Sequence, residues 1–368
     1  MTVFCTVTND LTYDQRMQRI CATLAGNGYS VELVGRVLPH SIALEERPFR
    51  QRRLKCRFNK GFLFYLEFNL RLFGLLLRAR YDAVCSVDLD TLPAGCMATL
   101  VRRKKRVFDA HEYFTEVPEV THRPLVKWVW QTAARICLPF YRHAYTVGPA
   151  LAAIFKEKYG MKFWVVRNMP LAAPDNGQVP EPRQQEPKIL LYQGALNEAR
   201  GIEQCLAALQ QLESVELWLA GEGDLSARLR KLAADLDVQD KVRFLGYIKP
   251  ADLPALTARA WLGLNVLENK GLSYYYSLAN KFFDYVQAGV PVLTMDFPEY
   301  RALNGEYEVA LLIERLTPAA IVNAVRYLQD NPEVYARLKE NTGLAAREWN
   351  WEKEEAAVLE IWASVGAT

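Results

Sequence analysis

The sequence lacks an excess of charge of either sign. Its 45 lysines and arginines nearly balance 42 aspartates and glutamates, which leaves a formal net charge of +3. A protein that binds nucleic acid over a broad surface carries a larger positive excess, so the composition predicts no nucleic acid partner. The hydrophobic content of 51% is that of an ordinary globular protein.

Closely spaced cysteines are also lacking. The seven cysteines lie far apart without a Cys-x-x-Cys pair, and several stand in apolar runs, as reduced core residues of a cytosolic protein do. No group of histidines and cysteines has the spacing of a zinc site, and no two acids are marked as the partners of a hydrolase. The sequence therefore predicts neither a metal nor a cofactor.

No apolar run is long enough to cross a membrane. The most apolar stretch, residues 61–77, is shorter than the roughly 20 residues that a spanning helix needs, and it contains Glu67 and Arg71. The first ten residues have neither the basic nor the apolar region of a secretory signal. These features predict a cytoplasmic protein.

A basic cluster followed by an apolar helical pattern extends from Arg47 to Arg80, and four basic residues follow at 102–105. This combination can place a protein on an anionic membrane surface, which would make it peripheral on the inner face of the membrane. The same pattern also fits a loop followed by a buried crossover helix. Both interpretations remain open.

The chain alternates short β-branched or aromatic runs with amphipathic helical patterns in both of its halves. With 368 residues it is long enough for two domains. Continuous apolar strands separated by helices indicate parallel sheets covered on both faces. We expect an α/β fold of two doubly wound, Rossmann-like domains that face each other across a cleft.

A change of composition sets the predicted domain boundaries. Residues 169–187 hold five prolines and no apolar period, which indicates a linker between domains at 1–168 and 188–348. Residues 349–368 form a helical pattern with three tryptophans at or next to it. We expect this last helix to return to the first domain.

A loop in the second domain has the form of a phosphate site. Gly194 ends the first strand of that domain, and Arg200 precedes a helix. Strand, turn and helix N-terminus together receive phosphates in many α/β proteins, and the arginine would be a fixed cation. The alternative is an ordinary surface arginine at a turn.

A second helix start follows at residue 277. At about 100° per residue, Ser277, Lys281 and Asp284 lie on one stripe, while Leu278 and Phe282 lie on a core stripe. The charged stripe is therefore predicted to face a polar ligand.

The stretch SLANKFFDYVQAGVPV, residues 277–292, resembles the nucleotide-sugar motif of family-4 retaining glycosyltransferases with the GT-B fold, whose bacterial branch reads SLPNKLFEYMAAGVPV. Other segments resemble that family in the same order. They are NDLTYDQRMQRI, GYSVELVGR, FDAHEYFTEVPE, VVRNMP, YQGALNEARGIE and LAGEGD. The resemblance extends over nearly the whole chain, with the first domain on the acceptor side and the second binding the nucleotide sugar.

The resemblance implies roles for the donor-side residues. Asp284 would bind the ribose hydroxyls, and Arg200 with Lys281 would bind the diphosphate beside Gly194. The amides of Ser277 and Leu278 would cap a phosphate at the helix start. Arg200, Lys281 and His111 would be catalytic, without a metal, and His111 would contact the transferred sugar. A structural role for His111 is the alternative.

Two positions depart from the family pattern. Tyr276 stands where the family has an acid that contacts the donor sugar, and Ala195 stands where an arginine often follows the loop glycine. Three acids at strand ends are either capping residues or acceptor-side contacts. They are Asp88, Asp90 and Glu112.

The function implied is a hexosyltransferase-like glycosyltransferase. It would move a sugar from a nucleoside diphosphate sugar to a glycan or lipid-linked acceptor, in the biosynthesis of surface polysaccharide or glycoconjugate. The alternatives are a GT-B epimerase or hydrolase of nucleotide sugars and a non-catalytic subunit that binds them. A dinucleotide-dependent oxidoreductase is disfavoured, because the first strand is not followed by a Gly-x-Gly-x-x-Gly turn.

Overall fold

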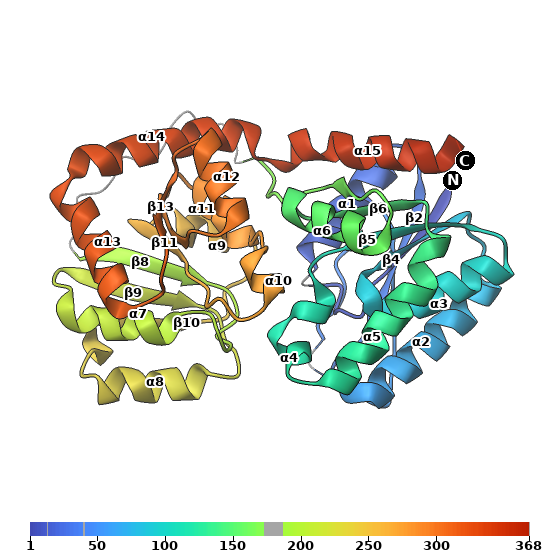
Figure 1. Cartoon of the computed structure of the whole chain (residues 1–368), viewed down its shortest axis with the longest axis horizontal. Helices are drawn as coiled ribbons and strands as arrows, with labels where there is room; N and C mark the ends of the chain where they lie inside the picture. The colour runs from blue at the N-terminus through green and yellow to red at the C-terminus, as the bar shows by residue number, and fades with distance from the viewer. Residues whose placement is uncertain (13, 40, 173–186, 368) are drawn as a thin grey trace. The chain divides into compact units, whose positions relative to one another are not determined.

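The computed structural model describes residues 1–12, 14–39, 41–172 and 187–367. The chain divides into two compact units, which are described separately (Figure 1). The first unit comprises Met1–Arg167, Gly271–Ser273 and Glu354–Thr368, and the second comprises Asn168–Lys270 and Tyr274–Lys353. Most of the predicted linker, residues 173–186, lies outside the described residues.

The first unit is built on a parallel sheet of seven described strands in the order β3-β2-β1-β4-β5-β6-β7. Helices cover both faces, because each parallel strand needs a crossover connection to the next. The strands are β1 (Thr2–Thr6), β2 (Ser30–Arg36), β3 (Arg50–Leu54), β4 (Ala83–Val87), β5 (Lys105–Ala110), β6 (His143–Thr146) and β7 (Trp164–Val165). The helices are α1 (Gln15–Gly26), α2 (Gly61–Arg78), α3 (Asp88–Val101), α4 (Pro118–Thr121), α5 (Pro124–Cys137) and α6 (Pro149–Tyr159).

The sequence explains which strands are central. All five residues of β4 are buried, and β1 lies beside β4 with Cys5 opposite Cys85. At the other extreme β3, with the sequence RQRRL, is an edge strand, where charged side chains are tolerated. Arg53 in β3 forms an ion pair with Asp10, so part of the basic cluster serves the fold.

The second unit is built on a parallel sheet of six described strands in the order β10-β9-β8-β11-β12-β13. The strands are β8 (Lys188–Gln193), β9 (Val215–Ala220), β10 (Val242–Gly246), β11 (Leu262–Asn265), β12 (Val292–Met295) and β13 (Ala310–Ile313). The helices are α7 (Ile202–Ala208), α8 (Ser226–Asp235), α9 (Leu253–Thr257), α11 (Asn280–Gln287), α12 (Pro298–Glu306), α13 (Pro318–Asp330) and α14 (Pro332–Glu348). The short helix α10 (Leu272–Tyr275) is divided between the two units after Ser273. Both sheets have the doubly wound arrangement that the alternating pattern predicts.

The last helix, α15 (Trp351–Ala367), is packed on the first unit from Glu354 onward, as predicted (Figure 1). Trp362 is fully buried there with its ring edge-on to Tyr29. Trp349, which the prediction placed at the start of this helix, instead packs in the second unit against Phe283. Among the described helices, none is both long and apolar enough to span a bilayer.

Candidate functional site

The first cluster of interest lies in the second unit, at the carboxyl end of β8. Gly194 follows this strand with a φ of +131°, a backbone conformation that residues other than glycine rarely adopt. A Cβ at this position would lie 3.3 Å from the Lys281 ammonium, and one at Gly221 would lie 1.9 Å from the Gly194 carbonyl oxygen. Both glycines therefore let the loops after β8 and β9 close around the lysine.

Two cations, Arg200 and Lys281, lie near each other in this cluster. The Arg200 guanidinium lies over the Tyr274 ring at 4.9 Å, and its buried Nε has no hydrogen-bond partner among the described residues. The Lys281 ammonium lies 3.7 Å from the centre of the Tyr192 ring. Burial, and then the charge of Arg200, hold the pKa of Lys281 well below its usual value. A bound anion would relieve this repulsion.

Asp284 lies one turn beyond Lys281 on α11, and a side chain at the end of β8 holds its carboxylate. Its Oδ2 accepts a hydrogen bond of 3.0 Å from the side-chain Nε2 of Gln193, whose Oε1 in turn accepts one of 2.9 Å from the Thr257 hydroxyl. The next residue, Tyr285, is buried and donates its hydroxyl to the Leu191 carbonyl at 2.9 Å. The buried contacts of Tyr285 thus fix the orientation of α11, and with it the direction in which Lys281 and Asp284 point.

The predicted helix start at Ser277 is wrong. Helix α11 begins at Asn280, and the Ser277 amide and hydroxyl both donate to the Tyr274 carbonyl oxygen, at 3.2 and 2.8 Å. Leu278 is buried in the core. The expected helix start is therefore corrected, because this segment is an irregular connection from α10 and the Ser277 amide is occupied by Tyr274. A contact between the Leu278 amide and a phosphate stays a prediction.

Tyr276 is half-buried in the same connection. Its ring lies edge-on to Tyr275 with centroids 4.9 Å apart, and Tyr275 in turn packs on Phe297. A neutral phenol therefore occupies the position at which the family pattern has a carboxylate. The Ala195 carbonyl accepts a hydrogen bond from Tyr192, so the loop keeps its shape without the family's arginine.

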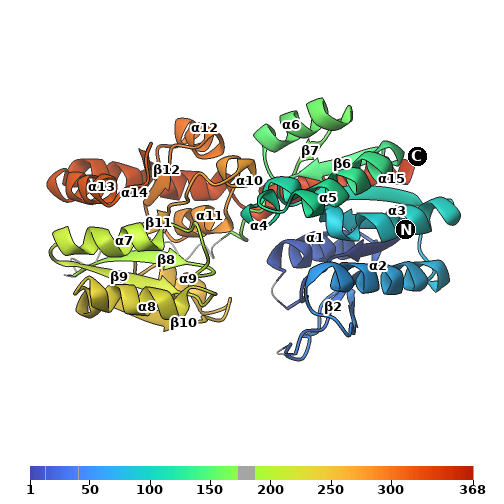
Figure 2. The ribbon, with the colours of Figure 1, turned by 60° about the horizontal axis from the view of Figure 1, so that its bottom comes forward.

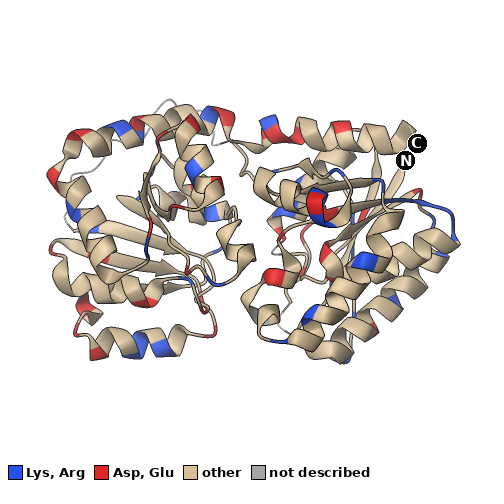
Figure 3. Ribbon diagram, viewed as in Figure 1, with Lys and Arg blue, Asp and Glu red and all other residues tan. Residues whose placement is uncertain are grey.

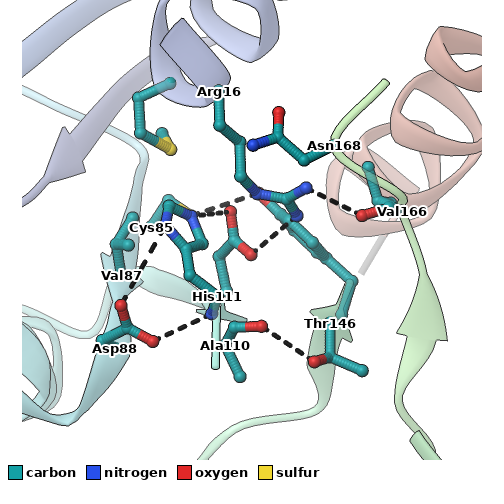
Figure 4. Close-up of polar contacts among 12 residues, drawn as sticks. Arg16, Cys85, Val87, Asp88, Ala110, His111, Thr146, Val166 and Asn168 are labelled. Atoms are coloured by element: carbon teal, nitrogen blue, oxygen red, sulfur yellow. Dashed lines mark hydrogen bonds and ion pairs between the residues drawn. The ribbon is translucent and has the colours of Figure 1, made fainter. Parts of the chain in front are cut away.

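A second cluster lies in the first unit, around the carboxyl ends of β4 and β5 (Figure 4). His111 follows β5, and its Nε2 lies 3.0 Å from an oxygen of the buried Asp109. The other Asp109 oxygen accepts a hydrogen bond of 3.0 Å from Arg16, whose guanidinium also donates to the Val166 carbonyl. The His111 amide donates to Asp88 at 2.8 Å. The ring and backbone of His111 are thus held by two carboxylates.

These contacts favour a protonated imidazole. Burial opposes the charge on His111, but the charge and hydrogen bond of Asp109, with the charge of Asp88, outweigh it and raise the pKa to about 9. Burial also disfavours the charged form of Asp109, yet Arg16 and His111 together hold the pKa of this carboxyl below its usual value. The cluster therefore presents a cation at the end of β5 at neutral pH.

We predict a pH-dependent stability from His111. Because its pKa of about 9 exceeds the ordinary 6.5, the contribution is complete below pH 6.5 and is lost as the pH rises through about 9. Urea unfolding of the wild type should lose up to about 3 kcal/mol more over this range than unfolding of His111→Gln. Equal losses in the two proteins would contradict the ion pairing.

The three predicted acceptor-side acids are placed differently. Asp88 and Glu112 line a small, partly open pocket with a cavity volume of about 10 Å³, together with the rings of Tyr113 and Tyr159. Asp90 is buried and accepts a hydrogen bond from Thr8. Its burial raises the pKa of its carboxyl to about 6, although Thr8 opposes this. Asp90 therefore makes a hydrogen bond inside the protein, whereas Asp88 and Glu112 line the pocket.

Sequence reasoning overlooked several residues on which these clusters depend. Arg16 and Asp109 form the buried ion pair that holds His111, and Gln193 holds Asp284. Asp109 was detectable as a charged residue within a buried strand, two positions before His111. Arg16 carried no comparable signal, since it lies in an ordinary amphipathic helix.

The two clusters differ in the chemistry that they allow. The cations of the second unit, beside a carboxylate and an aromatic ring, fit an anionic ligand that also offers hydroxyl groups. The cluster of the first unit presents a protonated imidazole next to acids and aromatic rings. Within the described residues, no three His, Cys, Asp or Glu side chains gather as they would to hold a metal ion.

Each half of the chain matches the model of a protein family. Residues 15–169 match the model of Glycosyltransferase Family 4, and residues 176–344 match that of Glycosyl transferases group 1. The matched ranges follow each other along the chain, as the two sheets do.

Two curated relatives come from Rhizobium meliloti (strain 1021). The lipopolysaccharide core biosynthesis glycosyltransferase LpsE is 37% identical over 59 residues, 16% of this chain and 17% of LpsE. The lipopolysaccharide core biosynthesis glycosyltransferase LpsD is 25% identical over 150 residues, 41% of either protein. The chain thus matches less than half the length of each relative.

Solved structures match over the full length. Sucrose-phosphate synthase from Thermosynechococcus elongatus has a TM-score of 0.78 and 16% identity, and the match covers 100% of this chain and 99% of that one. Anabaena HepE in complex with UDP-glucose has a TM-score of 0.76 and 16% identity, with coverage of 99% and 100%. The chain therefore carries a glycosyltransferase family 4 domain followed by a group 1 glycosyl transferase domain, built as the two Rossmann-like sheets of the GT-B fold.

Proposed function

We propose that the protein is a retaining glycosyltransferase. It would transfer a sugar, as a hexosyltransferase does, from a nucleoside diphosphate sugar to a hydroxyl of a glycan or lipid-linked acceptor. One observation carries this proposal: Arg200 lies near Lys281, and Lys281 lies one helical turn before the carboxylate of Asp284 on α11. A nucleoside diphosphate offers charges and ribose hydroxyls that match these three groups.

The chemistry proposed at the donor is electrostatic. As the bond between the anomeric carbon and the diphosphate breaks, negative charge grows on the leaving phosphate, and Arg200 with Lys281 stabilises it. A bond forms between the anomeric carbon and the acceptor oxygen on the same face of the sugar. The proton of the acceptor hydroxyl passes to the leaving phosphate oxygen. No metal is proposed in this step, because Arg200 and Lys281 supply the positive charge at the leaving phosphate. Asp284 holds the ribose through hydrogen bonds to its hydroxyls.

The relatives support the substrate class. HepE has been solved with UDP-glucose, and LpsE and LpsD act in lipopolysaccharide core biosynthesis. We propose, by analogy, a uridine diphosphate sugar as donor and an acceptor of surface polysaccharide or glycoconjugate biosynthesis. The protein would then work in the cytoplasm or at the inner face of the membrane, where Arg47–Arg80 remains a predicted contact with anionic lipid.

The first unit is proposed to serve the sugar and the acceptor. The protonated His111 can donate a hydrogen bond to a hydroxyl of the transferred sugar, and its orientation is set by Asp109 and Asp88. Asp88 and Glu112, beside aromatic rings at the mouth of a small pocket, are proposed as acceptor-side contacts, since carboxylates accept hydrogen bonds from hydroxyls. Tyr276 would meet the donor sugar with a neutral hydroxyl.

A thermal-shift screen of nucleotide sugars tests the proposal, because a ligand of the folded state raises the unfolding temperature. We expect stabilisation by one uridine diphosphate sugar, followed by transfer to an offered acceptor. Release of free nucleotide or an epimerised sugar without an acceptor would indicate the epimerase or hydrolase instead. Binding without any turnover, with a partner chain required for stability, would indicate a non-catalytic subunit.

Asp284→Asn tests the ribose contact. An amide keeps the size of the side chain but loses the charge that strengthens hydrogen bonds from ribose hydroxyls. We predict about 10-fold weaker binding of the ribonucleotide and little change for the 2′-deoxyribonucleotide, measured by calorimetry. A variant with an unchanged preference between the two ligands would remove Asp284 from the ribose.

A further inference from the structure

A cavity of about 220 Å³ lies in the first unit, far larger than the pocket of about 10 Å³ beside Glu112. Three of its lining residues, Thr2, Ser30 and Arg50, are the first residues of β1, β2 and β3. Because these strands are parallel, the cavity lies at the amino ends of the sheet, whereas His111 follows the carboxyl end of β5. A ligand of this cavity would therefore be separate from the proposed acceptor contacts.

The register of the strands gathers the lining side chains on one face of the sheet. Glu32 lies opposite both Phe4 and Arg50, and Arg52 follows Arg50 by two residues, so the alternation of side chains places all four on the same face. Arg80 comes from the connection that follows α2. This helix packs beside α3 and belongs to the same apolar cluster as Phe4 (Figure 2). Two separate segments thus bring three arginines to one cavity.

The cavity carries an excess of positive charge. It is lined by three arginines, Arg50, Arg52 and Arg80, and by one acid, Glu32, which leaves an excess of two positive charges. Glu32 is buried and forms an ion pair with Arg52. Arg50 and Arg80 form no ion pair with any residue that the structure describes. Elsewhere the two signs are mixed, and along α14, for example, Lys and Arg are interspersed with Glu (Figure 3).

The edge of the sheet explains only part of this cluster. Charged side chains on an edge strand prevent its pairing with another chain, which accounts for arginines on β3. Arg80 is not on that strand. The acid that follows it, Asp82, is already engaged, since it accepts a hydrogen bond of 2.8 Å from the Thr2 amide and lies 3.8 Å from Lys104. Cations from two elements therefore share a cavity without a counter-ion, and a bound anion would supply one.

We propose that this cavity binds a small phosphate monoester, with the phosphate between Arg50 and Arg80 and the rest of the ligand against Phe4 and the hydroxyls of Thr2 and Ser30. The arginine guanidinium donates paired hydrogen bonds to phosphate oxygens. A phosphate monoester carries close to two negative charges at neutral pH, which matches the excess of two, whereas a carboxylate carries one. The volume is below the roughly 300 to 1,000 Å³ of sites for drug-sized ligands, so the ligand is small. The inference is independent of the proposed transfer reaction.

A thermal-shift titration of the full chain with matched probes tests the class of ligand. Glucose 6-phosphate, gluconate and glucose have similar sizes but about two, one and no negative charges at neutral pH. We expect glucose 6-phosphate and inorganic phosphate to raise the unfolding temperature, with glucose 6-phosphate bound at least about tenfold more tightly than gluconate and no effect of glucose. Equal affinity for gluconate, or no stabilisation by either phosphate, would overturn the inference.

Substitution of the two arginines without ion pairs tests the place of binding. We expect Arg50→Ala and Arg80→Ala each to weaken the binding of glucose 6-phosphate about tenfold or more. Arg57 is the control, because it is exposed in the same unit and does not line the cavity. Arg57→Ala removes the same charge and should leave the affinity unchanged. An equal loss in all three variants would show a general attraction to the basic segment and would contradict a site in this cavity.

A variant that binds more tightly provides a test that damage to the fold does not imitate. Glu32→Gln removes the one acid of the cavity and releases Arg52, so the affinity for glucose 6-phosphate should rise about three- to fivefold. Unchanged or weaker binding would contradict the placement of the phosphate among these arginines.

The donor-side cations offer the phosphate probes another place to bind, and Arg200→Ala separates the two sites. We expect this variant to bind glucose 6-phosphate as the wild type does, even where its binding of a nucleoside diphosphate is weakened. Loss of glucose 6-phosphate binding in Arg200→Ala, with normal binding in Arg50→Ala, would place the probe on the donor side and overturn the inference. Failure of the proposed function and failure of this site are therefore distinguished.

Discussion

Replacing Arg200 by alanine is expected to weaken the binding of a nucleoside diphosphate by about 10- to 150-fold, the range expected when a charge-assisted hydrogen bond is lost. The guanidinium lies over Tyr274, and its Nε has no partner among the described residues, so an anionic ligand would satisfy a donor that the protein does not. The nucleoside without phosphates should bind the variant nearly as it binds the wild type. Calorimetry with both ligands measures the difference.

Arg259 provides a matched control. Its guanidinium lies over the Trp218 ring at 4.6 Å, similar to the 4.9 Å between Arg200 and Tyr274. Arg259→Ala therefore removes a cation from an aromatic ring in the same unit without touching the proposed site. We expect it to bind the diphosphate as the wild type does. Equal weakening of diphosphate and nucleoside in Arg200→Ala would refute a role on the diphosphate.

Replacing Asp109 by asparagine is expected to reduce the free energy of unfolding by about 3 kcal/mol or more, because the loss of one partner leaves a buried charge uncompensated. Arg16 and Asp109 are both buried, and Asp109 also holds His111. In the variant the imidazole loses its principal stabilising charge, so the pKa of His111 should fall. Urea unfolding measures the first effect, and NMR titration of His111 measures the second.

The exposed Asp82 serves as the control for this change. It lies 3.8 Å from Lys104 near the protein surface, where an ion pair contributes less than about 1 kcal/mol. Asp82→Asn should therefore change the free energy of unfolding by less than about 1 kcal/mol. If Asp109→Asn were no more destabilising than Asp82→Asn, the buried network would not be holding the end of β5.

The donor-side residues show how far sequence reasoning reaches. Lys281 and Asp284 were predicted on one stripe of a helix because three-residue spacing places them there in any α-helix. What lies beneath that stripe was not predictable. Gln193, which holds Asp284, is 91 residues away in the chain, and Tyr192, which receives Lys281, comes from the same distant strand.

The start of α11 shows a local prediction overruled. A serine before an apolar run is a favoured first residue of a helix, which is why Ser277 was expected there. In the structure the Ser277 amide and hydroxyl donate hydrogen bonds to the Tyr274 carbonyl oxygen, and the Tyr300 hydroxyl accepts one from the Ala279 amide. A local turn to Tyr274 and a tertiary contact from Tyr300 therefore bind the groups that a helix start at Ser277 would use, and the helix begins at Asn280 instead.

The basic segment Arg47–Arg80 shows that a sequence does not tell which of its charges form ion pairs. The cluster that begins at Arg47 suggested free positive charge, yet Arg52 pairs with Glu32 of β2 and Arg53 pairs with Asp10 of the loop after β1. The exposure of apolar side chains on α5, such as Leu125 and Trp128, was in contrast not anticipated, since a helical period does not tell which side of a helix a neighbour covers.

The sequence by itself determined the alternation of strands and helices that gives two parallel sheets, and the position of Lys281 and Asp284 on one stripe of a helix. Each follows from the spacing of residues within one segment, because helical and strand periods are local properties. Only the tertiary structure decided that Arg16 meets Asp109 across 93 residues and that the outer side of α2, α3 and α5 stays uncovered. These features depend on which segments pack together, and that is a property of the whole chain.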